Sequence, residues 1–127
     1  MRRPQDWMRQ AELDLELASA AREATRWEWA CFAAQQAAQK AVKALHESEG
    51  TEAWGHSVAA LLAGLVGVPV GLVDAAKALD KHYILARYPN AHPAGAPGDA
   101  YTAAEADRAL ADAEQVLEHV RRRLSPS

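Results

Sequence analysis

The chain has 127 residues, of which 50% are hydrophobic and 24% are charged, and its formal net charge at pH 7 is −3. This length corresponds to about one ordinary domain, and the apolar fraction is sufficient for a core. The acidic balance excludes a general nucleic-acid coat, which would be basic, but it leaves room for a small local nucleic-acid site. Cys31 is the only cysteine, so neither an internal disulfide nor a cysteine-based zinc site is expected.

No membrane segment is expected. The longest weakly polar stretch, residues 58–73, is interrupted by three glycines and one proline and is too short to cross a bilayer. The two arginines near the N-terminus are not followed by an apolar segment, so a signal peptide is not expected either. We therefore expect a cytoplasmic protein.

The first predicted helix covers residues 7–24, where Ala, Leu and Glu favour helix over strand. At helical spacing its apolar residues fall on two opposite faces. One face carries Trp7, Ala11, Leu15 and Ala18, and the other carries Leu13, Leu17, Ala20 and Ala24. Because a helix that is apolar on two sides is covered on two sides, we expect a second copy of the chain to pack on the Leu13 and Leu17 face.

Three further helices are predicted before the first long loop. The second runs from Trp27 or Trp29 to about residue 48, with small residues spaced for close helix packing at positions 30, 34, 37 and 41. A third covers residues 56–65, and a fourth covers residues 72–86. Pro89 stops the fourth helix because the residue before a proline disfavours the helical conformation. Residues 89–100, with three prolines and two glycines, are predicted to form a loop.

A capping box formed by Thr102 and Glu105 opens the last predicted helix. Apolar residues then repeat every seven positions, as Ala106, Ala113 and Val120 and as Leu110, Leu117 and Leu124. This seam is longer than one core needs and is a second reason to expect pairing with another copy. The sequence therefore predicts a single all-α domain, spanning residues 1–127 with a core at about 6–124, built from four or five helices.

No metal or cofactor site is expected from the sequence. No two of the five histidines are spaced three or four residues apart, and no acidic residue joins one of them in a ligand motif. There is no Gly-rich phosphate loop and no nucleophile motif.

Two further residue types are expected to have structural roles. His56 is expected to cap the third helix or pack beneath it, and the four tryptophans are expected to anchor the core.

The segment RYPNAHP, residues 87–93, is the strongest candidate for a functional site. Arg87 offers a planar, permanently charged fork for a phosphate, and His92 can carry a proton near neutral pH. These two groups are the minimum for cutting an RNA phosphodiester without a metal. Asp80 falls on the same helical face as Arg87, where it either orients the guanidinium or forms an ordinary surface pair. On spacing alone, a loop that carries two polar residues is the favoured interpretation of this segment.

Several segments, taken together, resemble the HEPN family of small helical domains. The stretches that carry the resemblance are DWMRQAELDLELA, WACFAAQQAAQKAVKALHESEG, GHSVAALL and ALDKHYILARYP, followed by the helix after Tyr101. They extend from residue 6 to about residue 120, and the second stretch is the most specific. The chain is therefore identified from its sequence as a member of this family.

The resemblance implies an up-and-down helical bundle that pairs two-fold through its helices, as a homodimer or a higher even oligomer. Many family members are metal-independent endoribonucleases that act as toxins, with a minimal nucleotidyltransferase as the antitoxin partner. Their Arg-x(4–6)-His motif lies at the dimer interface, and Arg87 and His92 match its spacing. Asp80, Tyr88 and Asn90, which lie near Arg87 in the sequence, are expected to contact the substrate, which is RNA or a nucleotide.

Two positions depart from the ribonuclease pattern of the family. Tyr88 stands where these ribonucleases usually have a small polar residue, and Ala94 stands where toxin members often have a tyrosine. Two interpretations therefore stay open. The first is an RNA-cleaving toxin with a nucleotidyltransferase partner, and the second is a non-catalytic helical module that binds a nucleotide or a partner.

Overall fold

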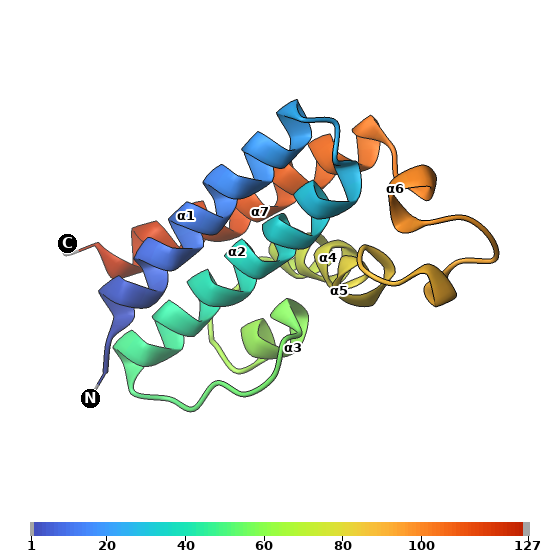
Figure 1. The fold of residues 1–127 in the computed structure, drawn as a ribbon. Coiled ribbons are helices and arrows are strands. Elements are labelled where there is room, and N and C mark those ends of the chain that lie inside the picture. The colour runs from blue at the N-terminus through green and yellow to red at the C-terminus, as the bar shows by residue number, and fades with distance from the viewer. Residues whose placement is uncertain (1, 126–127) are drawn as a thin grey trace.

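The computed structural model describes residues 2–125, and every regular element in this range is helical (Figure 1). The elements are α1 (Pro4–Glu23), α2 (Trp27–Glu49), α3 (Val58–Ala63), α4 (Val70–Asp80), α5 (His82–Leu85), the 3₁₀ helix η1 (Pro89–Ala91), α6 (Pro97–Ala100) and α7 (Ala103–Leu124). The predicted all-α class is confirmed. None of the described helices is long and apolar enough to span a bilayer.

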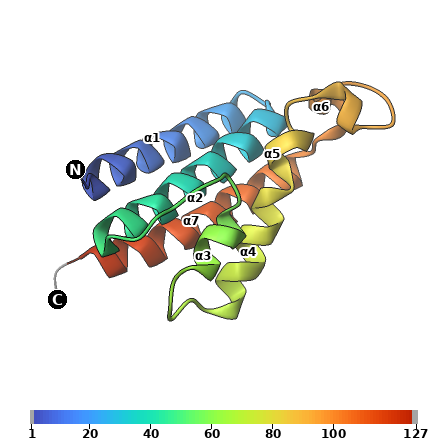
Figure 2. The ribbon, with the colours of Figure 1, turned by 90° about the horizontal axis from the view of Figure 1, so that it is seen from below.

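Three long helices, α1, α2 and α7, form the body of the bundle (Figures 1 and 2). The chain turns sharply after α1, so α2 runs back along it, and α7 packs against both. The shorter helices α3 and α4 pack on each other and on α2, and α4 also packs on α7. The long segment that contains η1 and α6 projects from the end of the bundle opposite to the two chain termini (Figure 1).

Small residues on α2 allow its neighbours to approach closely. Ala30, Ala34, Ala37 and Ala41 are completely buried, as the spacing predicted. The burial of α1 is also as predicted: one face packs into the core, and the face that carries Leu13 and Leu17 is exposed. On the open face, Leu13 is 37% exposed and Leu17 is 60% exposed.

Helix α7 begins with the predicted capping box, but its heptad-spaced apolar residues pack inside this chain rather than against a second copy. In the capping box, the hydroxyl of Thr102 accepts a hydrogen bond from the N–H of Glu105, and the carboxylate of Glu105 accepts one from the N–H of Thr102. Residues 106, 113, 117 and 120 are completely buried inside this chain, against α1, α2 and α4. The expectation that the seam is surplus to one core is therefore wrong, because three helices of the same chain cover it.

The structure also corrects the predicted fourth helix and the loop after it. The single helix predicted over residues 72–86 is divided into α4 and α5 at Lys81, whose dihedral angles (φ −61°, ψ −25°) are those of a 3₁₀ turn. The predicted loop contains η1 and α6, and each of these short helices has a proline at its first position. Pro89, which was expected only to stop a helix, is thus the first residue of η1.

Candidate functional site

Arg87 follows α5 and lies on an aromatic surface rather than beside an acid. Its Cζ atom lies 4.5 Å from the centroid of the Tyr83 ring, 4.6 Å from that of Phe32 and 5.0 Å from that of Tyr88. Its Nε atom donates a hydrogen bond to the carbonyl oxygen of Tyr83, at 2.8 Å. Within residues 2–125, neither Nη group has a hydrogen-bond partner, and no carboxylate lies within ion-pair distance.

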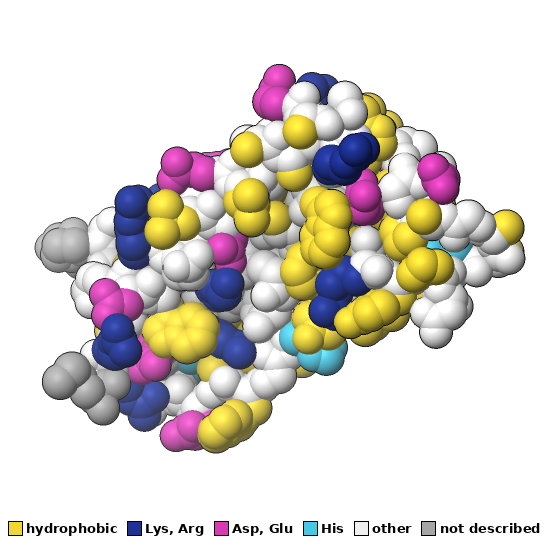
Figure 3. Space-filling model, in the orientation of Figure 1, with side chains coloured by type: hydrophobic (Ala, Val, Ile, Leu, Met, Phe, Trp, Pro, Cys, Tyr) yellow, Lys and Arg dark blue, Asp and Glu magenta, His cyan; other side chains and the backbone are white. Residues whose placement is uncertain are grey.

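This arrangement holds the guanidinium without consuming its donors. Contacts with aromatic rings take up no hydrogen-bond acceptor. Because neither Nη group has an acceptor within residues 2–125, both can donate to a planar anion, such as a carboxylate, or to a phosphate. Figure 3 shows hydrophobic side chains gathered around basic ones on this side of the molecule, over α2 and α5.

His56 belongs to the same surface. Its ring lies on Tyr83, with centroids 3.8 Å apart and an interplanar angle of 4°, and its side chain is exposed. The expectation that His56 caps α3 or packs beneath it is wrong, because Ser57 is the capping residue. We call the group formed by Phe32, His56, Tyr83, Arg87 and Tyr88 the Arg87 patch.

Asp80 does not contact Arg87, although the two residues share a predicted helical face. Its carboxylate accepts hydrogen bonds from the hydroxyl of Ser57 and from the N–H groups of Val58 and Ala59, at 2.8 to 3.1 Å. It also accepts one from the buried side chain of Gln35, at 3.3 Å. The predicted pairing of Asp80 with Arg87 is therefore wrong, because the free N–H groups at the start of α3 attract the carboxylate instead.

His92 lies against different neighbours from Arg87. Its Nε2 atom is 2.6 Å from the carbonyl oxygen of Leu85, and its ring meets that of Tyr101 edge-on, with centroids 6.3 Å apart. A carbonyl oxygen only accepts, so Nε2 carries a proton and Nδ1 is the nitrogen left to accept one. No hydrogen bond or ring contact joins Arg87 to His92 in the part of the chain that the structure describes.

The other two residues expected at the site are accessible. Tyr88 is 46% exposed and covers one side of the Arg87 guanidinium. Asn90 lies in η1, and its side chain is exposed. Sequence reasoning did not predict Phe32, Tyr83 or His56 at this site. Tyr83 lies four residues before Arg87, so helical spacing could have found it. No spacing rule could have found Phe32 or His56, because they come from α2 and from the loop before α3.

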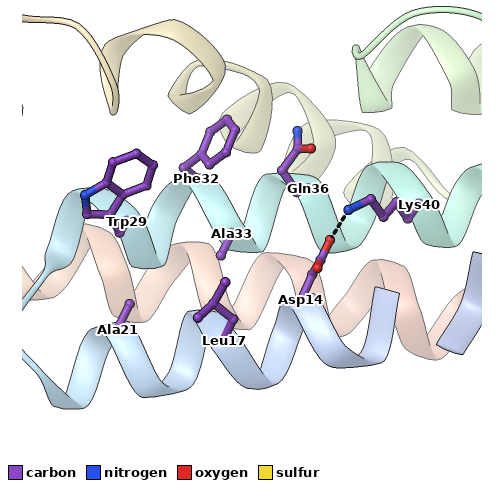
Figure 4. A pocket seen from close by; sticks show the side chains of 8 residues that line it. All are labelled: Asp14, Leu17, Ala21, Trp29, Phe32, Ala33, Gln36 and Lys40. Carbon is purple, nitrogen blue, oxygen red and sulfur yellow. Dashed lines mark hydrogen bonds and ion pairs between the residues drawn. The ribbon is translucent and has the colours of Figure 1, made fainter. Parts of the chain in front are cut away.

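A groove of about 370 Å³ lies beside the Arg87 patch, between α1 and α2 (Figure 4). Its lining is mostly apolar and shares Phe32 with the patch. The lining residues are Asp14, Leu17, Ala21, Trp29, Phe32, Ala33, Gln36 and Lys40. Lys40 and Asp14 form an ion pair at one end.

Trp29 and Trp54 are 48% and 81% exposed, so the expectation that all four tryptophans anchor the core is wrong for these two.

Other chemistry is not supported by the described residues. Burial raises the pKa of Cys31 to about 12, so its thiol is not a ready nucleophile. Burial also lowers the pKa of His82, whose Nδ1 lies 2.8 Å from the hydroxyl of Tyr101. Residues 2–125 contain no group of three His, Cys, Asp or Glu side chains placed to hold a metal ion.

Comparison with known proteins identifies relatives over nearly the whole chain. A family model described as the HEPN domain matches residues 4–123. A protein from Thermus thermophilus with a known crystal structure shares 50% sequence identity with this chain. The TM-score is 0.95, and the match covers 98% of this chain and 100% of that one. An archaeal HEPN homologue is 40% identical, with a TM-score of 0.86 and the same coverage. A HEPN domain protein from Thermotoga maritima is 37% identical, with a TM-score of 0.78 and coverage of 96% and 99%. The sequence matches no curated protein.

Proposed function

Because this chain belongs to the HEPN family, we propose that it is a metal-independent endoribonuclease of the toxin type, acting in the cytoplasm with a minimal nucleotidyltransferase as its partner. The observation that carries the proposal is the environment of the Arg87 guanidinium. It rests on aromatic rings, and neither of its Nη groups has a hydrogen-bond partner within residues 2–125. The nucleotidyltransferase partner follows from the family resemblance alone.

The Arg87 patch suits single-stranded RNA better than a duplex. A phosphate can take both Nη groups of Arg87, while unpaired bases stack on exposed aromatic rings. Tyr88 is exposed beside the guanidinium, and Asn90 is exposed in η1; both are proposed to contact the same substrate. Asp80 acts indirectly in this proposal, because its hydrogen bonds hold the start of α3 next to the patch.

His92 is proposed as a group that moves a proton at this site. The hydrogen bond of its Nε2 to Leu85 leaves Nδ1 free to take up and release a proton, as a general acid–base group must. Since Arg87 and His92 have different neighbours in one protomer, the proposal places a second copy of the chain beside them. Two copies of each residue would then line one shared cleft.

The proposed homodimer uses the open face of α1. Leu13 and Leu17 leave apolar surface on this face, and Leu17 also lines the groove beside the Arg87 patch. A two-fold pairing lets this face cover its own copy. Replacing both leucines by glutamate should give a folded monomer in light scattering at micromolar concentration, because both side chains are exposed in the protomer. A wild-type protein that is already monomeric would contradict the proposal.

A non-catalytic module that binds a nucleotide or a partner is the second candidate. The observation that favours it is that Arg87 and His92 bond to different residues and share no contact within residues 2–125. In this alternative, Arg87 still holds a phosphate or a carboxylate, and the segment RYP is a turn that presents it.

Incubation of the pure protein with structured RNA in the presence of a chelator separates the two candidates. The ribonuclease proposal predicts cleavage by the wild type and its loss in Arg87→Ala and in His92→Ala, both purified in the same way. The alternative predicts RNA or nucleotide binding that weakens in Arg87→Ala, with no cleavage by any of the three proteins.

A further inference from the structure

We propose that His56 is a catalytic residue of the RNA-cleaving site and accepts the proton of the 2′-hydroxyl while Arg87 holds the scissile phosphate. This inference rests on the proposed function and adds to it a residue outside the segment RYPNAHP. Three observations carry it: the free edge of the His56 ring, the polar network that fixes its backbone, and the Tyr83 ring that it shares with Arg87.

The edge of the His56 ring is available for chemistry. The ring is parallel to Tyr83 at 3.8 Å and therefore uses one of its faces for packing. Neither ring nitrogen has a hydrogen-bond partner within residues 2–125, and the side chain is exposed. A neutral imidazole in this position has one donor and one acceptor nitrogen to offer to a substrate.

A buried polar network fixes the backbone on which His56 stands. The completely buried side chain of Gln35 donates a hydrogen bond to the carbonyl oxygen of His56, at 2.8 Å, and another to Asp80. Asp80 in turn holds the next three residues through the hydroxyl of Ser57 and two backbone N–H groups. The loop before α3 is thus tied to α2 and α4. Tying it down in this way reduces the entropy lost when a reactive group is held in place.

Tyr83 brings His56 and Arg87 together. The His56 ring centroid lies 3.8 Å from the Tyr83 ring centroid, and the Cζ atom of Arg87 lies 4.5 Å from it. These distances put the imidazole and the guanidinium at most about 8 Å apart, with the Tyr83 ring between them, and one phosphodiester linkage with its ribose can span that separation along the edge of the ring. In the described part of the protomer, no other histidine ring contacts a ring that also contacts Arg87.

The step is an internal transesterification of RNA. Neutral His56 takes the proton from a 2′-hydroxyl, and the resulting oxygen attacks the adjacent phosphorus. The bond from phosphorus to the 5′-oxygen breaks, and that oxygen takes a proton from His92 in its protonated form. The products are a 2′,3′-cyclic phosphate and a 5′-hydroxyl; His56 then returns its proton to solvent, and His92 takes one up from it. The Nη groups of Arg87 stabilise the negative charge that builds on the phosphoryl oxygens.

The test replaces His56 by phenylalanine, which keeps the aromatic contact with Tyr83 and removes both nitrogens. With structured RNA and a chelator, His56→Phe should lower the cleavage rate at least about a hundredfold, which is the low end for loss of a general base. The urea midpoint should not move. His119→Phe makes the same change on α7, outside the patch, and should cleave at the wild-type rate.

The outcomes separate this inference from the proposed function. Cleavage by His56→Phe at the wild-type rate overturns the role of His56 and leaves the ribonuclease proposal in place. If the wild-type protein does not cleave RNA, both fall together.

A second measurement does not depend on cleavage. A 2′-O-methyl RNA oligonucleotide keeps the phosphates and bases but has no nucleophile, so it should bind and remain intact. Its addition should shift the imidazole resonances of His56 in an NMR spectrum, and Arg87→Ala should abolish the shift. If the oligonucleotide binds without moving the His56 resonances, His56 does not touch the substrate and the inference is wrong.

Discussion

Asp80 and Arg87 lie only seven residues apart, but the structure uses their charges in opposite ways. The carboxylate of Asp80 accepts hydrogen bonds from four donors, two of them backbone N–H groups at the start of α3. Arg87 has five N–H donors, and only Nε–H is engaged, with a carbonyl oxygen. A charge whose hydrogen-bonding capacity is filled by the fold contributes to stability, whereas a charge with donors to spare is available to a ligand.

The surroundings of the two residues reinforce this difference. Asp80 joins α2, α3 and α4 through polar contacts, so its removal leaves several donors unpaired. Arg87 contacts aromatic rings, which need no hydrogen bond in return. The comparison therefore predicts that substitutions at Asp80 affect stability most and that substitutions at Arg87 affect function most.

The largest expected change in stability is that of Asp80→Ala. Removing the carboxylate leaves the N–H groups of Val58 and Ala59 and the amide of Gln35 without their acceptor, so the free energy of unfolding should fall by about 3 kcal/mol. Urea denaturation measures this loss. Asp74→Ala, an exposed position on the same helix, should change the value by less than about 0.5 kcal/mol. Equal losses in the two variants would show that the Asp80 contacts are not what stabilises α3.

Arg87→Ala should cost much less stability. The contacts of its guanidinium with the three rings and one hydrogen bond are worth about 1 kcal/mol together at a partly exposed site. Arg87→Lys keeps the charge but loses the planar fork, so it should retain most of this stability while failing to restore RNA cleavage. Parallel urea melts and cleavage assays measure the two effects. A loss as large as that of Asp80→Ala would remove the distinction between the two residues.

His82 allows the same comparison to be made as a function of pH, because it is a partly buried group with a hydrogen-bond partner inside the fold. Burial lowers its pKa below the ordinary value of 6.5, so the unfolded chain takes up a proton more readily than the native protein. The free energy of unfolding should therefore fall as the pH drops below about 6.5 and should continue to fall until the native pKa is passed. His82→Gln should make the urea midpoint less dependent on pH between 7.5 and 5. An unchanged pH dependence would show that His82 does not contribute.

The smallest expected effect is the dependence of RNA affinity on salt concentration. With a net charge of −3, the protein does not attract RNA over long distances, so binding must come from a few local cations such as Arg87. The logarithm of the RNA affinity should therefore fall with the logarithm of salt concentration with a slope of about −2, which corresponds to two or three phosphate contacts. Fluorescence anisotropy at several salt concentrations gives the slope. Tight binding to any duplex with a steep slope would indicate a broad basic surface instead.

Local patterns predicted the helices well and the contacts of the site poorly. The capping box at Thr102 and Glu105 and the buried alanines of α2 follow from residue type and spacing, and both are confirmed. The spacing that placed Asp80 and Arg87 on one helical face was not enough to predict their partners. It could not show that the start of α3, more than twenty residues earlier in the chain, supplies the donors that Asp80 takes.

The sequence by itself determined the all-α class, the family and the segment that carries Arg87, because helix propensity, capping and apolar spacing act between residues close in the chain. Only the tertiary structure decided which charges are satisfied and which remain free. It buried the α7 seam under three helices, filled the hydrogen-bonding capacity of Asp80, and placed Phe32 and His56 beside the Arg87 and Tyr83 side chains. Those outcomes depend on helices that meet from distant parts of the chain, where packing and desolvation, rather than local spacing, determine the partner of each polar group.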